Sequence, residues 1–329
     1  MDSNFWFEKA FLDFGIVPEL FALIPRFNDR DRYDYLASSD SDEGLLMAAE
    51  NGILPLVQYF VNKGADDYTS AAIEAAYYGH LDVVKYMINL GANDYNTIMA
   101  VATDNGHTDI VKYMLSLGAN DYNKTLITAA GSGHIDIVKL MLERGANDYN
   151  SGMAEAARNG HIDIIPLMLS FGANDYNLAM ELAARNGHVN IVEYMLSLGA
   201  NNYNKTLVSA AEGGYTEIVE LMLERGANDY NSAMIEAARN GYIEIVDLML
   251  ERGANNYNLA MKIAAEEDNI DIVELMIERG ADPQLILSMA SQYSPTAISN
   301  IRQAIKIIHT GKRKREDIDM EDSDKYARY

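Results

Sequence analysis

The sequence predicts an all-α helix-turn-helix solenoid, and three observations support this fold class. A Gly-Ala pair recurs every 27 residues without insertion from Gly64 to Gly280, which marks eight complete repeats. Each repeat contains two stretches with apolar residues at helical spacing. In the repeat 172–198, Gly187 and Gly199 follow these stretches. Glycine readily adopts the left-handed conformation that ends a helix, so each stretch is expected to form one short helix.

The first helix of a repeat follows the link Gly-Ala-Asn-Asp-Tyr-Asn. In the repeat 172–198, Ala183 and Ala184 lie on one face of this helix, and we expect that face to pack against neighbouring repeats. Asn177 ends the link, and asparagine is a preferred capping residue. We therefore predict that Asn177 caps the N-terminus of the first helix.

The second helix carries an apolar stripe of Ile191, Val192, Met195 and Leu196. Neither helix of one repeat has enough apolar surface to be stable alone. Neighbouring repeats must therefore stack and bury these stripes against each other.

The outer charges of the second helices change along the chain. Asp82 precedes Lys85 by three residues, which allows an ion pair on the helix surface, and the next two repeats keep this order. Glu217 precedes Glu220 instead, so later repeats place like charges together. Two interpretations remain open at this point: a solubilising face that varies neutrally, or an acidic strip that docks a basic segment of a partner protein.

The chain divides into four predicted segments. Residues 1–43 are expected to form a degenerate helical cap with an inserted loop, and residues 44–283 the repeat array. Residues 284–311 are expected to form capping helices, because Pro295 favours a helix start and isoleucines follow at helical spacing. Residues 312–329 form a charged tail that is expected to be disordered.

The repeated run 183–188, Ala-Ala-Arg-Asn-Gly-His, with Ile-Val at 191–192 and Leu-Gly-Ala-Asn at 198–201, resembles the core of the ankyrin repeat. The resemblance covers residues 44–283. Ankyrin repeats usually have 33 residues and a projecting β-hairpin. The shorter repeat implies that the hairpins are reduced or absent. Such short repeats are similar to those of ankyrin proteins from large DNA viruses of amoebae.

The resemblance implies a non-enzymatic scaffold that binds a partner protein on the concave face of the first helices. First-helix positions that vary between repeats, where packing does not fix the side chain, are the candidates for binding. These residues are Tyr77, Asp104, Ser151, Arg158, Leu178, Arg185, Lys205, Ser232, Arg239 and Leu259.

Composition argues against several other functions. A formal net charge of -23 disfavours nucleic-acid binding through a basic surface, and the absence of cysteine excludes thiolate sites. There is no uncharged apolar run of membrane-spanning length. Phosphate-loop, zinc-helix and nucleophile-elbow motifs are also absent, so we expect no catalytic residue, small-molecule substrate, cofactor or metal.

A column of histidines offers one further candidate site, formed by His80, His107, His134, His161 and His188. Successive copies should lie about 10 Å apart, as packed helices do. One zinc ion needs ligands at about 2 Å. We therefore predict that these histidines bond to neighbouring backbone and do not bind metal.

Two short motifs suggest alternatives. Residues 17–20 (Val-Pro-Glu-Leu) with Leu23 and Ile24 resemble the start of an F-box, which would imply a substrate adaptor of a ubiquitin ligase. A basic run favours nuclear import, although a merely charged tail explains it as well. This run consists of Lys312, Arg313, Lys314 and Arg315. We expect an intracellular monomer in the cytoplasm or nucleus, of a host cell if the protein is viral; the sequence leaves the partner and the source open.

Overall fold

The structure is a computed structural model that describes residues 3–14, 16–24, 30–32, 40–288, 291 and 293–308. These residues form helices and turns, with no β-strand among them, which confirms the all-α prediction. Within the same residues, no helix has both the length and the apolar character that a membrane span requires. The four predicted segment boundaries remain predictions.

The chain forms two compact units, which are described separately. Unit 1 contains residues 1–156 and 163–173, and unit 2 contains residues 157–162 and 174–329. The helices of unit 1 are α1 (Ser3–Phe14), α2 (Pro18–Ala22), α4 (Ser41–Glu50), α5 (Leu54–Asn62), α6 (Tyr68–Tyr78), α7 (Leu81–Leu90), α8 (Tyr95–Asp104), α9 (Thr108–Ser116), α10 (Tyr122–Gly131), α11 (Ile135–Glu143), α12 (Tyr149–Arg158), whose end is assigned to unit 2, and α13 (Ile165–Ser170).

Unit 2 continues the same alternation of first and second helices. Its helices are α14 (Tyr176–Arg185), α15 (Val189–Ser197), α16 (Tyr203–Gly213), α17 (Thr216–Glu224), α18 (Tyr230–Asn240), α19 (Ile243–Glu251), α20 (Tyr257–Glu266), α21 (Ile270–Glu278), α22 (Pro283–Leu287) and a helix over 295–308.

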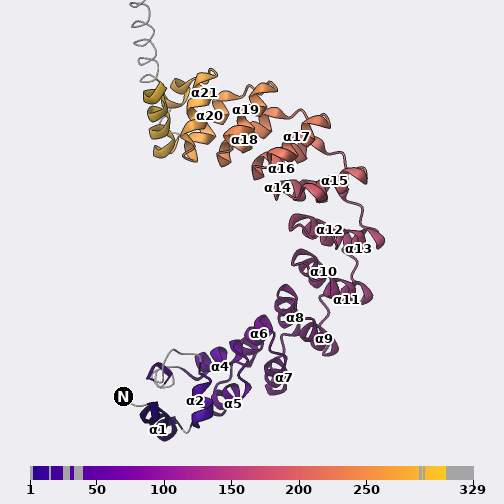
Figure 1. Cartoon of the computed structure of the whole chain (residues 1–329), viewed down its shortest axis with the longest axis vertical. Helices are drawn as coiled ribbons and strands as arrows, with labels where there is room; N and C mark the ends of the chain where they lie inside the picture. The colour runs from indigo at the N-terminus through magenta and orange to yellow at the C-terminus, as the bar shows by residue number, and fades with distance from the viewer. Residues whose placement is uncertain are drawn as a thin grey trace, which may run out of the picture. The chain divides into compact units, whose positions relative to one another are not determined.

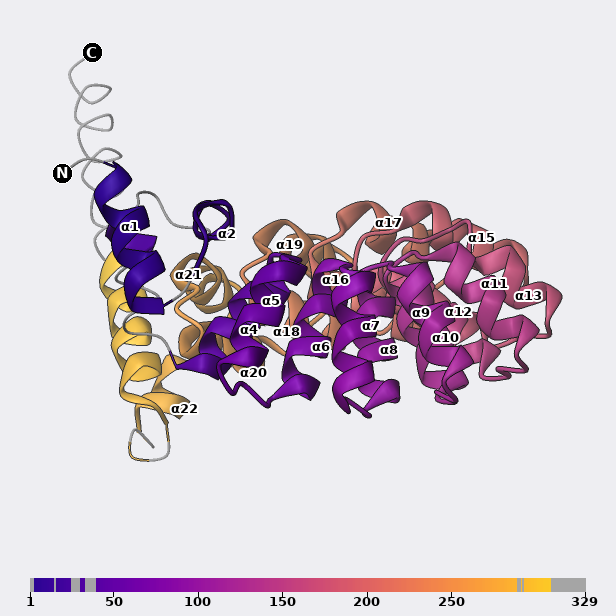
Figure 2. The same cartoon turned by 90° about the horizontal axis from the view of Figure 1, so that it is seen from below.

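Within each unit the first helices, which carry even numbers from α4 to α20, form one layer, and the second helices form the other (Figure 1). Neighbouring first helices pack closely, whereas neighbouring second helices touch at few points. The difference follows from side-chain size. Small residues such as Ala129 and Ala130 are buried in the first layer, and larger residues such as Met141 are buried in the second. Each unit therefore curves toward its first helices, and Figure 2 shows those of unit 1 side by side from below.

The polar groups of the link join consecutive repeats. Asp175, not Asn177, caps α14, because its Oδ1 accepts a hydrogen bond of 3.2 Å from the Leu178 N–H. The Asn177 Oδ1 instead accepts bonds from the N–H groups of Asn201, at 2.8 Å, and Asn202, at 3.0 Å. The prediction that Asn177 caps its own helix is wrong. Its side chain holds the next link.

We call this pair of bonds the asparagine link, and it recurs in both units. In each case one side-chain oxygen in the first turn of a first helix accepts from two backbone N–H groups, 24 and 25 residues later. The link is also made by Asn96, Asn123, Asn204 and Asn231, and by a carboxylate oxygen of Asp42. Two otherwise unsatisfied donors are thereby paired in every such link.

The turn between the two helices of a repeat also contacts the next repeat. Gly106 has a φ of +77°, and a Cβ there would lie 2.7 Å from Cε1 of His134. The His134 Nε2 donates a bond of 3.0 Å to the carbonyl of Asp104. Glycine is required here for both conformation and space.

The same bond to a carbonyl 30 residues earlier is made by His80, His107 and His188. The prediction of a backbone-bonded histidine is confirmed for these residues and for His134. In the later repeats of unit 2 the column changes, and the Tyr215 ring lies against Gly187.

Near the end of unit 2, two asparagines replace the histidine in this bond to a backbone carbonyl of the preceding repeat. Asn269 donates a bond of 3.0 Å to the carbonyl of Ala238, and Asn300, in the helix 295–308, donates one of 2.8 Å to the carbonyl of Ala265. The two carbonyls are 27 residues apart, so Asn300 takes the place that the next repeat would fill. The capping role of residues 284–311 stays a prediction.

Candidate protein-binding surface

The residues predicted to bind a partner all lie on first helices. One group contains the third residue of each of five first helices: Ser151, Leu178, Lys205, Ser232 and Leu259. The other group contains residues at or next to the C-terminal end of their first helices: Tyr77, Asp104, Arg158, Arg185 and Arg239. Each side chain is exposed or half-buried. Sequence therefore located the surface, and binding by these residues remains a prediction.

In unit 1 this surface presents apolar and aromatic side chains beside polar ones. Ile73 and Ile127 are half-buried at the middle of α6 and α10. The exposed ring of Tyr77 packs edge-on against Tyr78, with centroids 4.8 Å apart. Asp104 accepts a bond of 2.8 Å from the Ser132 hydroxyl. The surface of unit 1 thus combines apolar side chains with polar groups.

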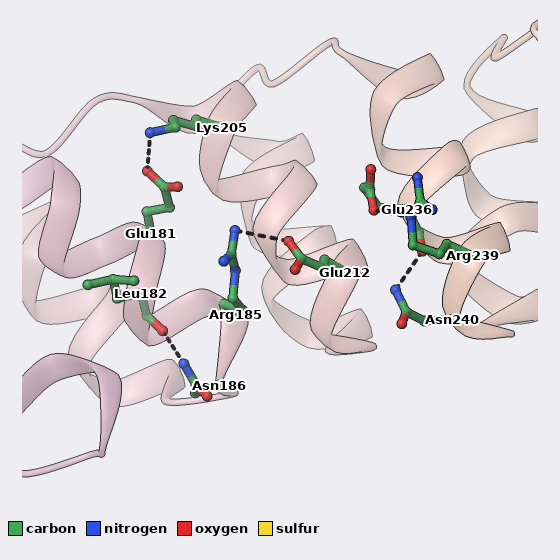
Figure 3. A network of polar contacts seen from close by, with 9 residues as sticks. All are labelled: Glu181, Leu182, Arg185, Asn186, Lys205, Glu212, Glu236, Arg239 and Asn240. Atoms are coloured by element: carbon green, nitrogen blue, oxygen red, sulfur yellow. Dashed lines mark hydrogen bonds and ion pairs between the residues drawn. The ribbon is translucent and has the colours of Figure 1, made fainter. Parts of the chain in front are cut away.

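In unit 2 ion pairs between neighbouring first helices cover the same surface. The Lys205 Nζ on α16 lies 2.8 Å from Oε2 of Glu181 on α14 (Figure 3). The Arg185 Nη2 at the end of α14 lies 2.9 Å from Oε2 of Glu212 on α16. These two pairs join α14 and α16 in opposite directions, because the cation lies on α16 in the first and on α14 in the second.

A third pair lies within α18. The Arg239 Nε lies 3.1 Å from Oε2 of Glu236, one turn earlier. The Asn240 side-chain amide donates to the Glu236 carbonyl at 3.0 Å (Figure 3). The end of α18 is therefore fixed by both side-chain and backbone contacts.

Sequence reasoning missed the three carboxylates of these pairs. A signal was present for Glu181, because Ala154 and Val208 occupy the same position in the preceding and following repeats. A charge at a position that is apolar in both neighbouring repeats needs a partner. Lys205 supplies it from 24 residues further along the chain.

The outer charges of unit 1 do not pair as predicted. The Lys85 Nζ lies 5.5 Å from the centre of the Tyr113 ring in the next second helix, a cation-π contact. The Asp82 Oδ1 accepts a bond of 2.9 Å from the Val83 N–H in its own first turn. No ion pair joins these two described residues, and each side chain contacts another group.

The second helices of unit 2 concentrate negative charge. Burial raises the pKa of the Glu274 carboxyl above its ordinary value, and the nearby charges of Asp271 and Glu278 raise it further. Arg279 approaches Asp247 at 3.6 Å. The raised pKa of Glu274 shows that Asp271 and Glu274 interact unfavourably, as the sequence predicts for such like-charged pairs.

Two other predictions concern a metal site and the basic run near the C-terminus. Within the described parts of the chain, no group of three or more His, Asp or Glu side chains has an arrangement that could hold a metal ion. The basic run of Lys312, Arg313, Lys314 and Arg315 lies outside the described residues.

Comparison with known proteins identifies the repeats. The family model "Ankyrin repeats (3 copies)" matches residues 45–125, 75–152, 126–206, 153–232 and 207–286. A search of curated proteins gave no match. The similarity to viral ankyrin proteins is untested. Ankyrin repeats are protein-protein interaction modules and are not enzymes as a family. Since the family model covers more than half of the chain, the protein belongs to the ankyrin-repeat family.

Proposed function

We propose that the chain is a non-enzymatic scaffold that binds a partner protein on its first-helix layer. One observation carries this proposal: the groups that join repeats stay constant, whereas the exposed positions of the first helices vary. The third residue of the first helix is Ser151, Leu178 and Lys205 in successive repeats. A surface that varies on a constant skeleton is suited to recognition, and the inner side of a curved layer is where it can enclose a partner.

The test is affinity capture with a matched pair of triple variants. One variant replaces Arg158, Arg185 and Arg239 on the first helices by alanine. The other replaces Arg225, Arg252 and Arg279, which end the second helices α17, α19 and α21.

Both variants lose the same charge, so they differ only in the layer affected. Partners captured by the native chain should be lost with the first variant and retained with the second. Unchanged capture by the first variant, with native helicity, would exclude these arginines from the surface.

Several finer points are part of this proposal. The chain acts as a monomer in the cytoplasm or nucleus, which light scattering and fluorescent tagging can test. A basic partner segment remains the prediction for the acidic second helices of unit 2. For the import signal, the comparison is the full-length protein with a deletion of 312–329. If both proteins distribute equally between nucleus and cytoplasm, residues 312–329 do not act as an import signal.

A second candidate function is the ubiquitin-ligase adaptor. It is favoured by exposed apolar side chains in α1 and on both sides of α2. Leu12 is 79% exposed, Val17 46% and Leu23 48%. A Skp-type linker protein captured through residues 1–43 would support the adaptor. Capture that needs only residues 64–280 supports the scaffold alone.

A further inference from the structure

Both helix layers of unit 2 carry cations. On the second-helix layer, Arg225, Arg252 and Arg279 directly follow α17, α19 and α21. The second helices α15, α17, α19 and α21 contain carboxylates but no lysine or arginine. The first helices contain Arg185, Lys205, Arg239 and Lys262. In a chain with a formal net charge of -23, the first helices therefore offer a negative partner cations within their own length.

Three of these cations are held in place by carboxylates that are less accessible than they are. Lys205 is 60% exposed and its partner Glu181 only 10%. Arg239 is 44% exposed against 28% for Glu236. Arg185 is 41% exposed against 37% for Glu212. In each of these pairs the cation is therefore the more accessible partner.

Each cation uses only part of its hydrogen-bonding capacity. The ion pair of Arg185 engages Nη2, and that of Arg239 engages Nε. A guanidinium has five N–H donors and an ammonium has three. Donors therefore remain on each side chain. Because the ion pairs already restrict the side chains, binding an anion costs less conformational entropy than it would for free ones.

The positions of the cations define the shape of the ligand. Lys205 and Glu212 are two turns apart on α16, which is about 10 Å along the helix. Lys205 therefore lies at one edge of the surface, and Arg185 and Arg239 lie toward the other (Figure 3). Between them Val208 is half-buried and can take an apolar side chain.

One boundary of this surface is also visible. Glu266 and Glu267, at the end of α20, are both exposed. They would repel a carboxylate that extended past α18 in that direction. The favourable area therefore spans α14, α16 and α18.

We infer that this surface binds an acidic, amphipathic segment of the partner protein, whose carboxylates contact Arg185, Lys205 and Arg239 on either side of an apolar side chain. The inference rests on the proposed function and specifies the partner class for unit 2. Charge-assisted hydrogen bonds to carboxylates supply both affinity and orientation.

The test uses two fluorescently labelled peptides with the full chain, one alternating Glu with Leu and one alternating Lys with Leu. Anisotropy should show binding of the acidic peptide. Its affinity should fall by at least about tenfold when Arg185, Lys205 and Arg239 are replaced by glutamine. The matched control replaces Arg225, Arg252 and Arg279 by glutamine, removes the same charge from the other layer and should change affinity by less than about twofold.

A folding control is needed because Lys205→Gln leaves the nearly buried Glu181 without its partner. Adding Glu181→Gln removes that charge, and circular dichroism checks the helices. The inference is overturned if the native chain fails to bind the acidic peptide, if the first triple variant binds it as well as the native chain does, or if the basic peptide competes for the same surface. If captured partners still depend on first-helix residues in that case, the scaffold proposal survives and only the partner class is wrong.

Discussion

Units 1 and 2 share one skeleton and differ in the surface built on it. Asn123 in unit 1 and Asn204 in unit 2 make the same asparagine link, with bonds of 2.7 and 2.6 Å to the first N–H. On the first-helix layer, however, unit 1 presents Ile73, Tyr77 and Ile127, whereas unit 2 presents ion pairs. The groups that join repeats are thus separate from those available for recognition, so one can change without the other.

The largest expected effect tests the skeleton at the turn. Gly106→Ala in unit 1 and Gly214→Ala in unit 2 should each destabilise the fold by about 3 kcal/mol, from left-handed strain plus displacement of a packed ring. The added Cβ would lie 2.7 Å from the His134 ring and 2.5 Å from the Tyr242 ring. Urea unfolding followed by circular dichroism measures both.

The controls are Gly118→Ala and Gly226→Ala, which have positive φ but no atom within 4 Å of the added Cβ. Strain alone should cost about 1 to 2 kcal/mol. A much larger loss in one unit than in the other would show that the skeletons are not equivalent.

The next effect concerns the asparagine link. Asn123→Ala and Asn204→Ala each remove the acceptor of two backbone N–H groups, and each should cost about 1 to 2 kcal/mol by the same measurement. Asn123→Asp keeps the acceptor, as Asp42 does naturally. If the aspartate variant is as unstable as the alanine variant, the link does not stabilise through this bond.

A smaller effect distinguishes the two surfaces. Lys205→Gln should cost about 1 kcal/mol, because it leaves Glu181 nearly buried and unpaired, with the loss reduced by the exposure of the lysine. Lys124, at the same position in unit 1, is exposed, and Lys124→Gln should change stability by less than about 0.5 kcal/mol. A double-mutant cycle with Glu181→Gln isolates the pair. Equal losses at both lysines would contradict the contrast between the units.

The smallest effect compares the second helices. A raised pKa means that folded Glu274 binds its proton more tightly than the unfolded chain does, so its ionisation destabilises the fold as pH rises through the raised pKa. Glu274→Gln should therefore gain a few tenths of a kcal/mol at neutral pH. The gain should vanish below the ordinary carboxyl range. Lys139→Gln, at the equivalent position beside Asp136 in unit 1, should give no gain.

Much of the fold could be predicted from the repeat period. The burial of Ala183 and Ala184 follows from helical spacing, and the glycine turns follow from backbone conformation. The role of Asn177 could not be predicted, because a capping side chain and one that bonds the next repeat look alike in one repeat. Lys85 shows the same limit: local spacing suggested Asp82, but stacking brings Tyr113 within reach.

The candidate surface was predicted in position but not in chemistry. Arg185 and Lys205 were recognised as variable first-helix residues, and the structure places them there. Their carboxylate partners lie 27 and 24 residues away, so only the lateral packing of helices reveals the pairs. The positions of the charged residues in the sequence therefore do not show whether the cation or the carboxylate of each pair is the more exposed side chain.

The asparagine link also bears on how such a protein can change length. Each link contacts only the residues 24 and 25 positions ahead, so copying or deleting a whole repeat leaves every joint intact. Residues 118–144 resemble residues 199–225, three repeats further on, which is the trace that such copying leaves. A newly copied block would keep the same link at each of its ends, and its exposed side chains would then be free to diverge toward another ligand.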